Sequence, residues 1–174
     1  MGKIFLTGNT FFGREKALQM ECRKQFKSVL EMDEHYISRW NEFVTDDDTV
    51  FVLGGFAQDP FTGSYAIENL NGDIVFIDSL VDKINKDAIR MYEDFVTFID
   101  SQIFEITEKK SIISYFPLEF WSPNSDIFHF YCDETIIPDL NTVPNRLNCS
   151  INIFGRPMEI DALIEFVNEF NKLK

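Results

Sequence analysis

The sequence contains few of the residues on which metal and thiol chemistry depend. Only two histidines occur among its 174 residues, and the three cysteines, Cys22, Cys132 and Cys149, form no Cys-x-x-Cys pair. An odd number of unclustered cysteines favours reduced thiols over a disulfide framework or a zinc site. No window reaches the ~18 consecutive apolar residues of a membrane span, and no basic region followed by an apolar signal core begins the chain. We therefore expect a protein that is made and kept inside a cell and is not secreted.

Basic residues are also scarce. Lysine and arginine total 16 against 29 aspartates and glutamates, which leaves a formal net charge of -13. A field of that sign repels phosphate backbones and anionic lipids. We expect no nucleic acid and no membrane among the partners of this protein.

Apolar and aromatic residues are abundant, because hydrophobic residues make up 45% of the chain and 19 residues are phenylalanine. This length and composition predict one domain over residues 1–174 with a large core. Short apolar runs alternate with helical patterns, which predicts an α/β fold. Clear examples are a helix over residues 29–44, a hairpin over residues 102–115 and a final helix over residues 160–170. We interpret Asp46, Asp47 and Asp48 as a solvated turn after the first of these helices.

The first apolar run, residues 3–7, stops abruptly in the loop Gly-Asn-Thr-Phe-Phe-Gly-Arg at residues 8–14. Open α/β sheets place their chemistry at such junctions. The stretch resembles the first motif of the small calcineurin-like metallophosphoesterases found in phages and bacteria, in which a strand ends in Ser-Asp-Thr-His-Phe-Gly-His. The resemblance places the metal-binding Asp at Asn9, the first His at Phe11 and the second His at Arg14. The frame of the motif is kept and its ligands are lost.

The later motifs repeat this loss in the same order along the chain. Where the family has Leu-Gly-Asp-Phe, Gly-Asn-His-Asp, Ser-His-Tyr-Pro-Leu and His-Gly-His, this sequence lacks every histidine and keeps one acid, Asp82. The resemblance implies that Leu80 replaces a metal ligand and that Val81 replaces the acid that protonates the leaving group. The resulting degenerate site consists of Asn9, Phe11, Gly55, Leu80, Val81, Asp82, Tyr115, Tyr131 and Asp133.

The resemblance implies a four-layer α/β sandwich, in which two mixed sheets face each other with helices outside and the last helix on an outer face. A two-metal phosphoesterase needs a dense set of ligands, so the replaced set predicts an inactive protein with no metal or other cofactor. Two alternatives stay open. One is a phosphoesterase with a rebuilt or single-metal site, in which Asn9, Asp82 and Asp133 hold one hard cation. The other is a small-ligand sensor that uses the old cleft.

Aromatic residues gather at the loops that surround the metals in the family. We expect Phe11, Leu80, Val81, Tyr115 and Tyr131 to lie near one another and to be shielded from water. We further expect a structural or interaction protein, in the cytoplasm of a host cell or within a bacteriophage particle, whose partners are other proteins. The candidate contacts are Phe116, Phe120 and Trp121, together with the loop over residues 134–145, since exposed aromatic loops give large contact areas.

Overall fold

The computed structural model describes residues 2–77, 96–118, 126–134 and 144–172. Leu80, Val81 and Asp82, and also Phe120 and Trp121, lie outside the described residues. The same holds for most of the loop over residues 134–145.

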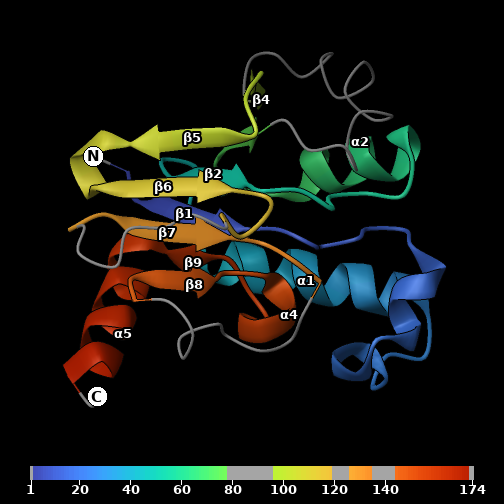
Figure 1. Cartoon of the computed structure of the whole chain (residues 1–174). Coiled ribbons are helices and arrows are strands. Elements are labelled where there is room, and N and C mark those ends of the chain that lie inside the picture. Colours follow the sequence, from blue (N-terminus) through green and yellow to red (C-terminus); the bar gives the residue numbers. More distant parts are fainter. Residues whose placement is uncertain (1, 78–95, 119–125, 135–143, 173–174) are drawn as a thin grey trace.

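The N-terminal half of the chain builds most of a five-stranded mixed sheet (Figure 1). Its strands are β1 (Ile4–Thr7), β2 (Thr49–Val52), β3 (Asp73–Ile77), β4 (Val96–Ile99) and β9 (Met158–Glu159). Their order is β4-β3-β2-β1-β9, with β9 antiparallel to β1 and the other neighbours parallel. The carboxyl ends of β1 and β2 therefore meet at one edge, where the loops that follow them lie side by side.

A second mixed sheet has the order β5-β6-β7-β8. Its strands are β5 (Ile103–Ile106), β6 (Ser111–Ser114), β7 (Phe128–Tyr131) and β8 (Arg146–Asn148). Strands β5 and β6 form the predicted hairpin, joined by one 3-10 turn, η4 (Thr107–Lys109), and by Lys110 in the left-handed region. Strands β6, β7 and β8 run parallel.

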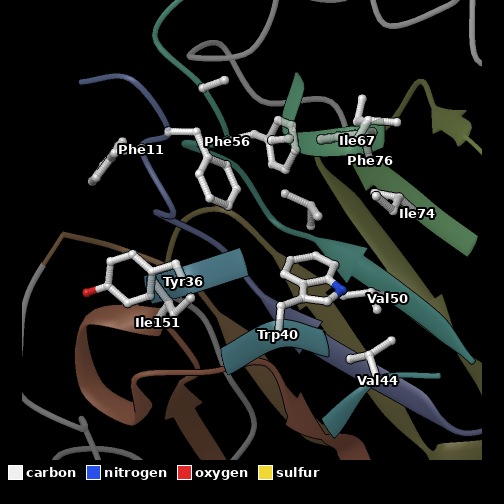
Figure 2. Close-up of a cluster of buried hydrophobic side chains, with 14 of the residues drawn as sticks. Phe11, Tyr36, Trp40, Val44, Val50, Phe56, Ile67, Ile74, Phe76 and Ile151 are labelled. Atoms are coloured by element: carbon white, nitrogen blue, oxygen red, sulfur yellow. The ribbon is translucent and has the colours of Figure 1, made fainter. Parts of the chain in front are cut away.

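Helices cover one face of the five-stranded sheet. Helix α1 (Val29–Phe43) begins where the Ser28 side chain accepts a hydrogen bond from the Glu31 N–H, and α2 (Pro60–Asn69) begins at Asp59 in the same way. Both caps satisfy backbone donors that a helix start leaves open. The predicted helix over residues 29–44 is confirmed, and its Tyr36 and Trp40 pack in one buried cluster with Phe56, Ile67, Ile74 and Phe76 (Figure 2).

The other face of this sheet packs against the second sheet. Alternation along β1 and β2 sends Phe5 and Val50 toward the helices, and Leu6 and Phe51 toward the second sheet. The buried residues between the sheets also include Cys132 and Cys149, and all three cysteines are free thiols as predicted.

Helix α5 (Ile160–Lys172) also contributes to the cluster between the sheets, through Ile160, Leu163 and Val167. The expectation that the last helix packs on an outer face was therefore wrong. The reason is the connection, because α5 begins directly after the edge strand β9 and contacts β1, β8 and β9 (Figure 1).

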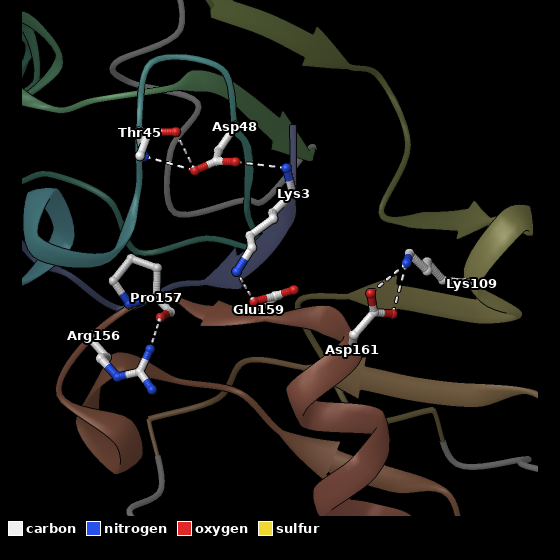
Figure 3. A network of polar contacts seen from close by, with 8 residues as sticks. All are labelled: Lys3, Thr45, Asp48, Lys109, Arg156, Pro157, Glu159 and Asp161. Carbon is white, nitrogen blue, oxygen red and sulfur yellow. Dashed lines mark hydrogen bonds and ion pairs between the residues drawn. The ribbon is translucent and has the colours of Figure 1, made fainter. Parts of the chain in front are cut away.

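The acidic turn after α1 differs from its prediction at one residue. Asp46 and Asp47 are exposed, but Asp48 is only 4% exposed and accepts hydrogen bonds from the backbone N–H groups of Thr45 and Lys3 at 2.8 and 2.7 Å. Although partial burial opposes it, these bonds lower the pKa of Asp48. Figure 3 shows how Asp48 holds the start of β1, while the Lys3 ammonium reaches Glu159 on β9.

Two mixed sheets with α-helices confirm an α/β sandwich. Four α-helices occur among the described residues, the fourth being the short α4 (Ile151–Phe154). Two 3-10 helices, η1 (Glu15–Gln19) and η2 (Glu21–Arg23), lie between the β1 loop and α1. One domain over residues 1–174 stays a prediction.

Candidate functional site

The loop after β1 is held against the loop after β2. The Asn9 N–H donates to the Gly54 carbonyl at 2.7 Å, and the Phe11 N–H donates to the Gly55 carbonyl at 2.8 Å. Asn9 and Phe11 adopt φ values of 58° and 54°. Non-glycine residues in this left-handed region cost about 1 kcal/mol or more each, and such residues cluster at functional sites. The resemblance places lost metal ligands at both positions.

Gly55 has no room for a side chain. Its φ is 66°, and an added Cβ would lie 2.5 Å from the Asn9 Oδ1 and 2.8 Å from a Phe11 ring carbon. The structure therefore brings Asn9, Phe11 and Gly55 together, as the resemblance implies. Their packing excludes the bridging carboxylate that the family carries at the position of Gly55.

Asn9 connects this loop to the second sheet through polar side chains. Its Nδ2 donates to the Asp133 carbonyl at 2.6 Å and to the Ser150 Oγ at 3.3 Å. The Asp133 carboxylate accepts from the Asn148 Nδ2 at 2.7 Å, and the Asn148 Oδ1 accepts from the Ser150 N–H at 3.0 Å. Asn9, Asn148 and Ser150 are fully buried. Neutral amides and a hydroxyl thus fill the space between the ends of β1, β7 and β8.

A buried cation completes this network. The Arg23 side chain is fully buried and donates from its guanidinium to the carbonyls of Asn9 and Thr10, the latter at 2.9 Å. Two further donors reach the Asn152 Oδ1 at 3.0 and 2.7 Å. The Tyr36 ring centroid lies 4.8 Å from the guanidinium carbon. Burial lowers the pKa of Arg23, and no carboxylate among the described residues forms an ion pair with it.

Asp33 on α1 fixes the far end of the loop. Its Oδ2 accepts a hydrogen bond from the Gly13 N–H at 2.9 Å, while its Oδ1 is buried without a partner in the described part of the chain. The side chain is only 8% exposed. Burial raises the pKa of Asp33 to about 6, against the smaller opposing effects of the Gly13 hydrogen bond and the Arg23 charge.

Tyr115 and Tyr131 are buried, but they do not join Phe11 in one cluster. Phe11 belongs to the core on the helix side of the first sheet. Tyr131 alternates along β7 with Phe130, which faces the space between the sheets, so Tyr131 points to the outer face of the second sheet. There its ring lies 5.7 Å from the His129 ring, and the Arg146 guanidinium carbon lies 5.7 Å from its centroid. Phe11, Tyr115 and Tyr131 are shielded from water as expected, but the expected proximity is wrong for Phe11 and Tyr131. The other two members of the expected cluster, Leu80 and Val81, are not described.

One further pair of reactive side chains involves β6 and β7. The Ser114 Oγ and the His129 Nε2 are 2.8 Å apart, and both residues are buried. Ser114 donates its hydroxyl proton to the Phe116 carbonyl at 2.6 Å, so it accepts from the imidazole. Burial, together with the Arg146 charge, lowers the pKa of His129 to about 4. A buried serine whose hydroxyl proton is donated to a backbone carbonyl is not activated as a nucleophile.

The described residues do not fit the two-metal centre that the resemblance implies. No three histidine, cysteine, aspartate or glutamate side chains gather closely enough to hold a metal within the described ranges. The single-cation alternative keeps one candidate ligand, the Asn9 Oδ1, which has no partner among the described atoms. Asp82 is not described, and the Asp133 carboxylate accepts from Asn148. Binding of one cation at Asn9, Asp82 and Asp133 stays a prediction.

Comparisons with known proteins support the fold and leave the activity open. No protein-family model matches the chain. The chain is 26% identical to MJ1445, an uncharacterized protein of Methanocaldococcus jannaschii, over 97% of this chain and 93% of that protein. It superposes with a TM-score of 0.71 on the crystal structure of AQ665, a protein of unknown function from Aquifex aeolicus, at 13% identity, and the match covers 95% of this chain and 100% of AQ665. No helix in the described ranges is long and apolar enough to cross a membrane.

We predict that the substitution Arg23→Met lowers the free energy of unfolding by about 2–4 kcal/mol, because the carbonyls of Asn9 and Thr10 lose buried donors. The control is Lys24→Met at the exposed neighbouring residue. The ion pair between Lys24 and Glu21 is worth at most about 0.5 kcal/mol. Urea denaturation of both variants measures the difference. Equal stability of the two variants would show that the Arg23 network does not hold the loop.

We predict that the Asp33→Asn variant gains folding stability relative to the wild type as the pH rises. The Asp33 carboxyl binds its proton more tightly in the folded chain than in the unfolded chain, where its pKa is 3.8. The stability that this proton contributes to the fold is fully present below about pH 3.8 and is lost as the pH rises through about 6. Between about pH 4 and about pH 7 we expect the wild type to lose about 2 kcal/mol relative to the Asp33→Asn variant.

Denaturation midpoints of the wild type and the variant at both pH values measure this difference, with Asp46→Asn at the exposed turn as a control for the loss of one negative charge. A difference between wild type and Asp33→Asn that does not change with pH would contradict the raised pKa.

Proposed function

We propose that this protein is a catalytically inactive, phosphoesterase-like protein that acts through contact with other proteins. The observation that carries the proposal is the filled space at the ends of β1, β7 and β8. There the Asn9 Nδ2 donates to the Asp133 carbonyl and the Ser150 Oγ, and Gly55 admits no side chain. The proposed finer fold is the four-layer calcineurin-like sandwich, supported by the two facing mixed sheets and the helices over the first sheet.

The chemistry of the site supports an inactive protein. Metal-assisted hydrolysis of a phosphate ester needs cations that activate water and neutralise the developing charge. Arg23 instead gives the loop carbonyls of Asn9 and Thr10 a permanent cationic partner. The loop conformation therefore needs no metal to hold it. The guanidinium is fully buried, so it cannot reach a substrate.

The proposed contact surface begins at Phe116, two residues after the end of β6. Phe116 is 49% exposed and its ring packs edge-on against Tyr115, with 4.5 Å between the centroids. A ring fixed in this way offers contact area at little ordering cost. Contacts through Phe120 and Trp121, a cytoplasmic location and a place in a bacteriophage particle stay predictions.

We predict that the protein, expressed in medium supplemented with manganese, iron and zinc, retains no stoichiometric metal and does not hydrolyse bis(4-nitrophenyl) phosphate. The physical reason is the absence of histidine and bridging carboxylate ligands at the described motif positions. Elemental analysis and a turnover assay, run beside an authentic two-metal phosphodiesterase, measure both. Two metals per chain with turnover would overturn the proposal of an inactive protein, and one metal with turnover would favour the rebuilt site.

We predict that Phe116→Ser abolishes cross-linking of the protein to its partners in its native cells and leaves the melting temperature within ~2 °C of the wild type, as for most surface changes. Phe61→Ser is the matched control, because Phe61 is 84% exposed and lies on α2, away from β6. Unchanged cross-linking in Phe116→Ser would remove this surface from the proposal. Equal loss in both variants would point to general surface hydrophobicity.

A further inference from the structure

A surface pocket of about 590 Å³ lies beside the loop after β1. One wall is formed by Phe11 and by residues 13–16, and the other by Ala57 and Gln58, which precede α2. The two walls are fixed to each other, because the Gln58 N–H donates to the Phe12 carbonyl at 2.8 Å. A volume of this size is typical of small-molecule sites, for which about 300–1,000 Å³ is usual.

Arg14 offers this pocket a guanidinium with unused donors. Its side chain is 34% exposed, and its one ion-pair partner among the described residues is Glu134, whose Oε1 lies 3.6 Å from the Arg14 Nη1, which is beyond hydrogen-bond distance. The guanidinium donates no hydrogen bond to any other side chain or carbonyl of the described ranges. Lys16, on the same wall, is exposed and forms no ion pair with a described residue. Two available cations thus face one pocket in a protein whose net charge is -13.

The Arg14 guanidinium is held in position before any ligand arrives. Its carbon lies 4.5 Å from the centroid of the buried Phe11 ring, and the Arg14 N–H donates to the Phe11 carbonyl at 3.0 Å. The preceding residue, Gly13, is held by Asp33. A planar guanidinium stacked on a ring presents parallel N–H donors, which match the two oxygens of a carboxylate.

The balance of charge favours a monoanion over a dianion. Glu15 lines the pocket with Arg14 and Lys16, and Glu134 lies next to Arg14. These two carboxylates offset the two cations, so the pocket has no excess positive charge to offer a phosphate dianion. Phe11 and Ala57 also line the pocket, but they are only 2% and 8% exposed, so recognition of a ligand rests on the charged contact at Arg14.

We propose that this pocket binds a small organic carboxylate, with Arg14 as its charged contact. Glu134 is then an internal competitor that the ligand displaces from Arg14. The site is independent of the proposed contact with other proteins, because the pocket does not include Phe116. Failure of either proposal leaves the other in place.

The test titrates the isotope-labelled full chain with benzoate, with its neutral analogue benzamide and with phenyl phosphate, and reads the amide shifts of Gly13 and Gln58. We expect saturable binding of benzoate, tighter than either analogue. Loss of a charge-assisted bidentate contact in Arg14→Gln weakens benzoate about 10-fold or more, with Arg14→Lys between it and the wild type. Glu134→Gln strengthens benzoate binding about 2- to 3-fold, because the competing carboxylate is removed. Lys172→Gln, an exposed lysine on α5, is the matched control and changes nothing.

Several outcomes would overturn the proposal. Benzamide binding as tightly as benzoate shows that no charged contact is made, and phenyl phosphate binding more tightly than benzoate assigns the pocket to phosphate instead. An affinity for benzoate that is unchanged in Arg14→Gln, or absent from the wild type at millimolar concentrations, removes Arg14 from any site. Amide spectra of Arg14→Lys that match the wild type away from the pocket show that the fold is kept, so that weakened binding reports on Arg14 itself.

Discussion

A buried guanidinium without a carboxylate partner among the described residues constrains the N-terminal half of the fold. Arg23 donates to the carbonyls of Asn9 and Thr10 and to the amide of Asn152, so it joins the β1 loop to the start of α4. A buried charged group is stable only when its hydrogen-bond donors have acceptors. The rings of Phe11 and Tyr36 cover the guanidinium faces, and the carbonyls and the amide take its edges. The left-handed conformations of Asn9 and Phe11 are compatible with this arrangement, because they turn successive backbone groups toward Gly54, Gly55 and Arg23.

This constraint separates the present site from a metal centre in physical terms. A metal site concentrates anionic or imidazole ligands around a removable cation, and its affinity depends on pH and metal supply. Here the cation is covalently part of the chain, and the groups that accept its hydrogen bonds are neutral. The hydrogen-bond network from Arg23 through Asn152, Ser150 and Asn9 to Asp133 stabilises the fold. It joins segments that lie near opposite ends of the sequence.

The regular elements were predictable because their signals are local. The apolar stripe of Tyr36 and Trp40 and the cap at Ser28 identify α1 without any tertiary information. The alternating runs around η4 identify the hairpin for the same reason. The proximity of Asn9, Phe11 and Gly55 followed from the motifs, since parallel strands end at a common edge.

The rest depends on long-range geometry that a single sequence does not encode visibly. An arginine is usually exposed, so nothing local marks Arg23 as buried. Asp48 is one of three adjacent aspartates, and its structural role depends on the long-range hydrogen bond that it accepts from the Lys3 N–H. The direction of Tyr131 depends on strand register, because a shift by one residue reverses the face of every side chain. Asn148 and Ser150 carried no motif, because nothing local marks a polar residue at the end of β8 or before α4 as buried.

Gly55 also has a consequence for the history of such a loop. A side chain there collides with Asn9 and Phe11, whose own conformations depend on contacts with the same glycine. A carboxylate at residue 55 is therefore tolerated only after the neighbouring positions have changed. Any evolutionary path between this loop and a metal-binding one, in either direction, needs several concerted replacements. While Asn9 and Phe11 keep these conformations, a single substitution that adds a side chain at residue 55 is blocked, whereas exposed positions stay open to change.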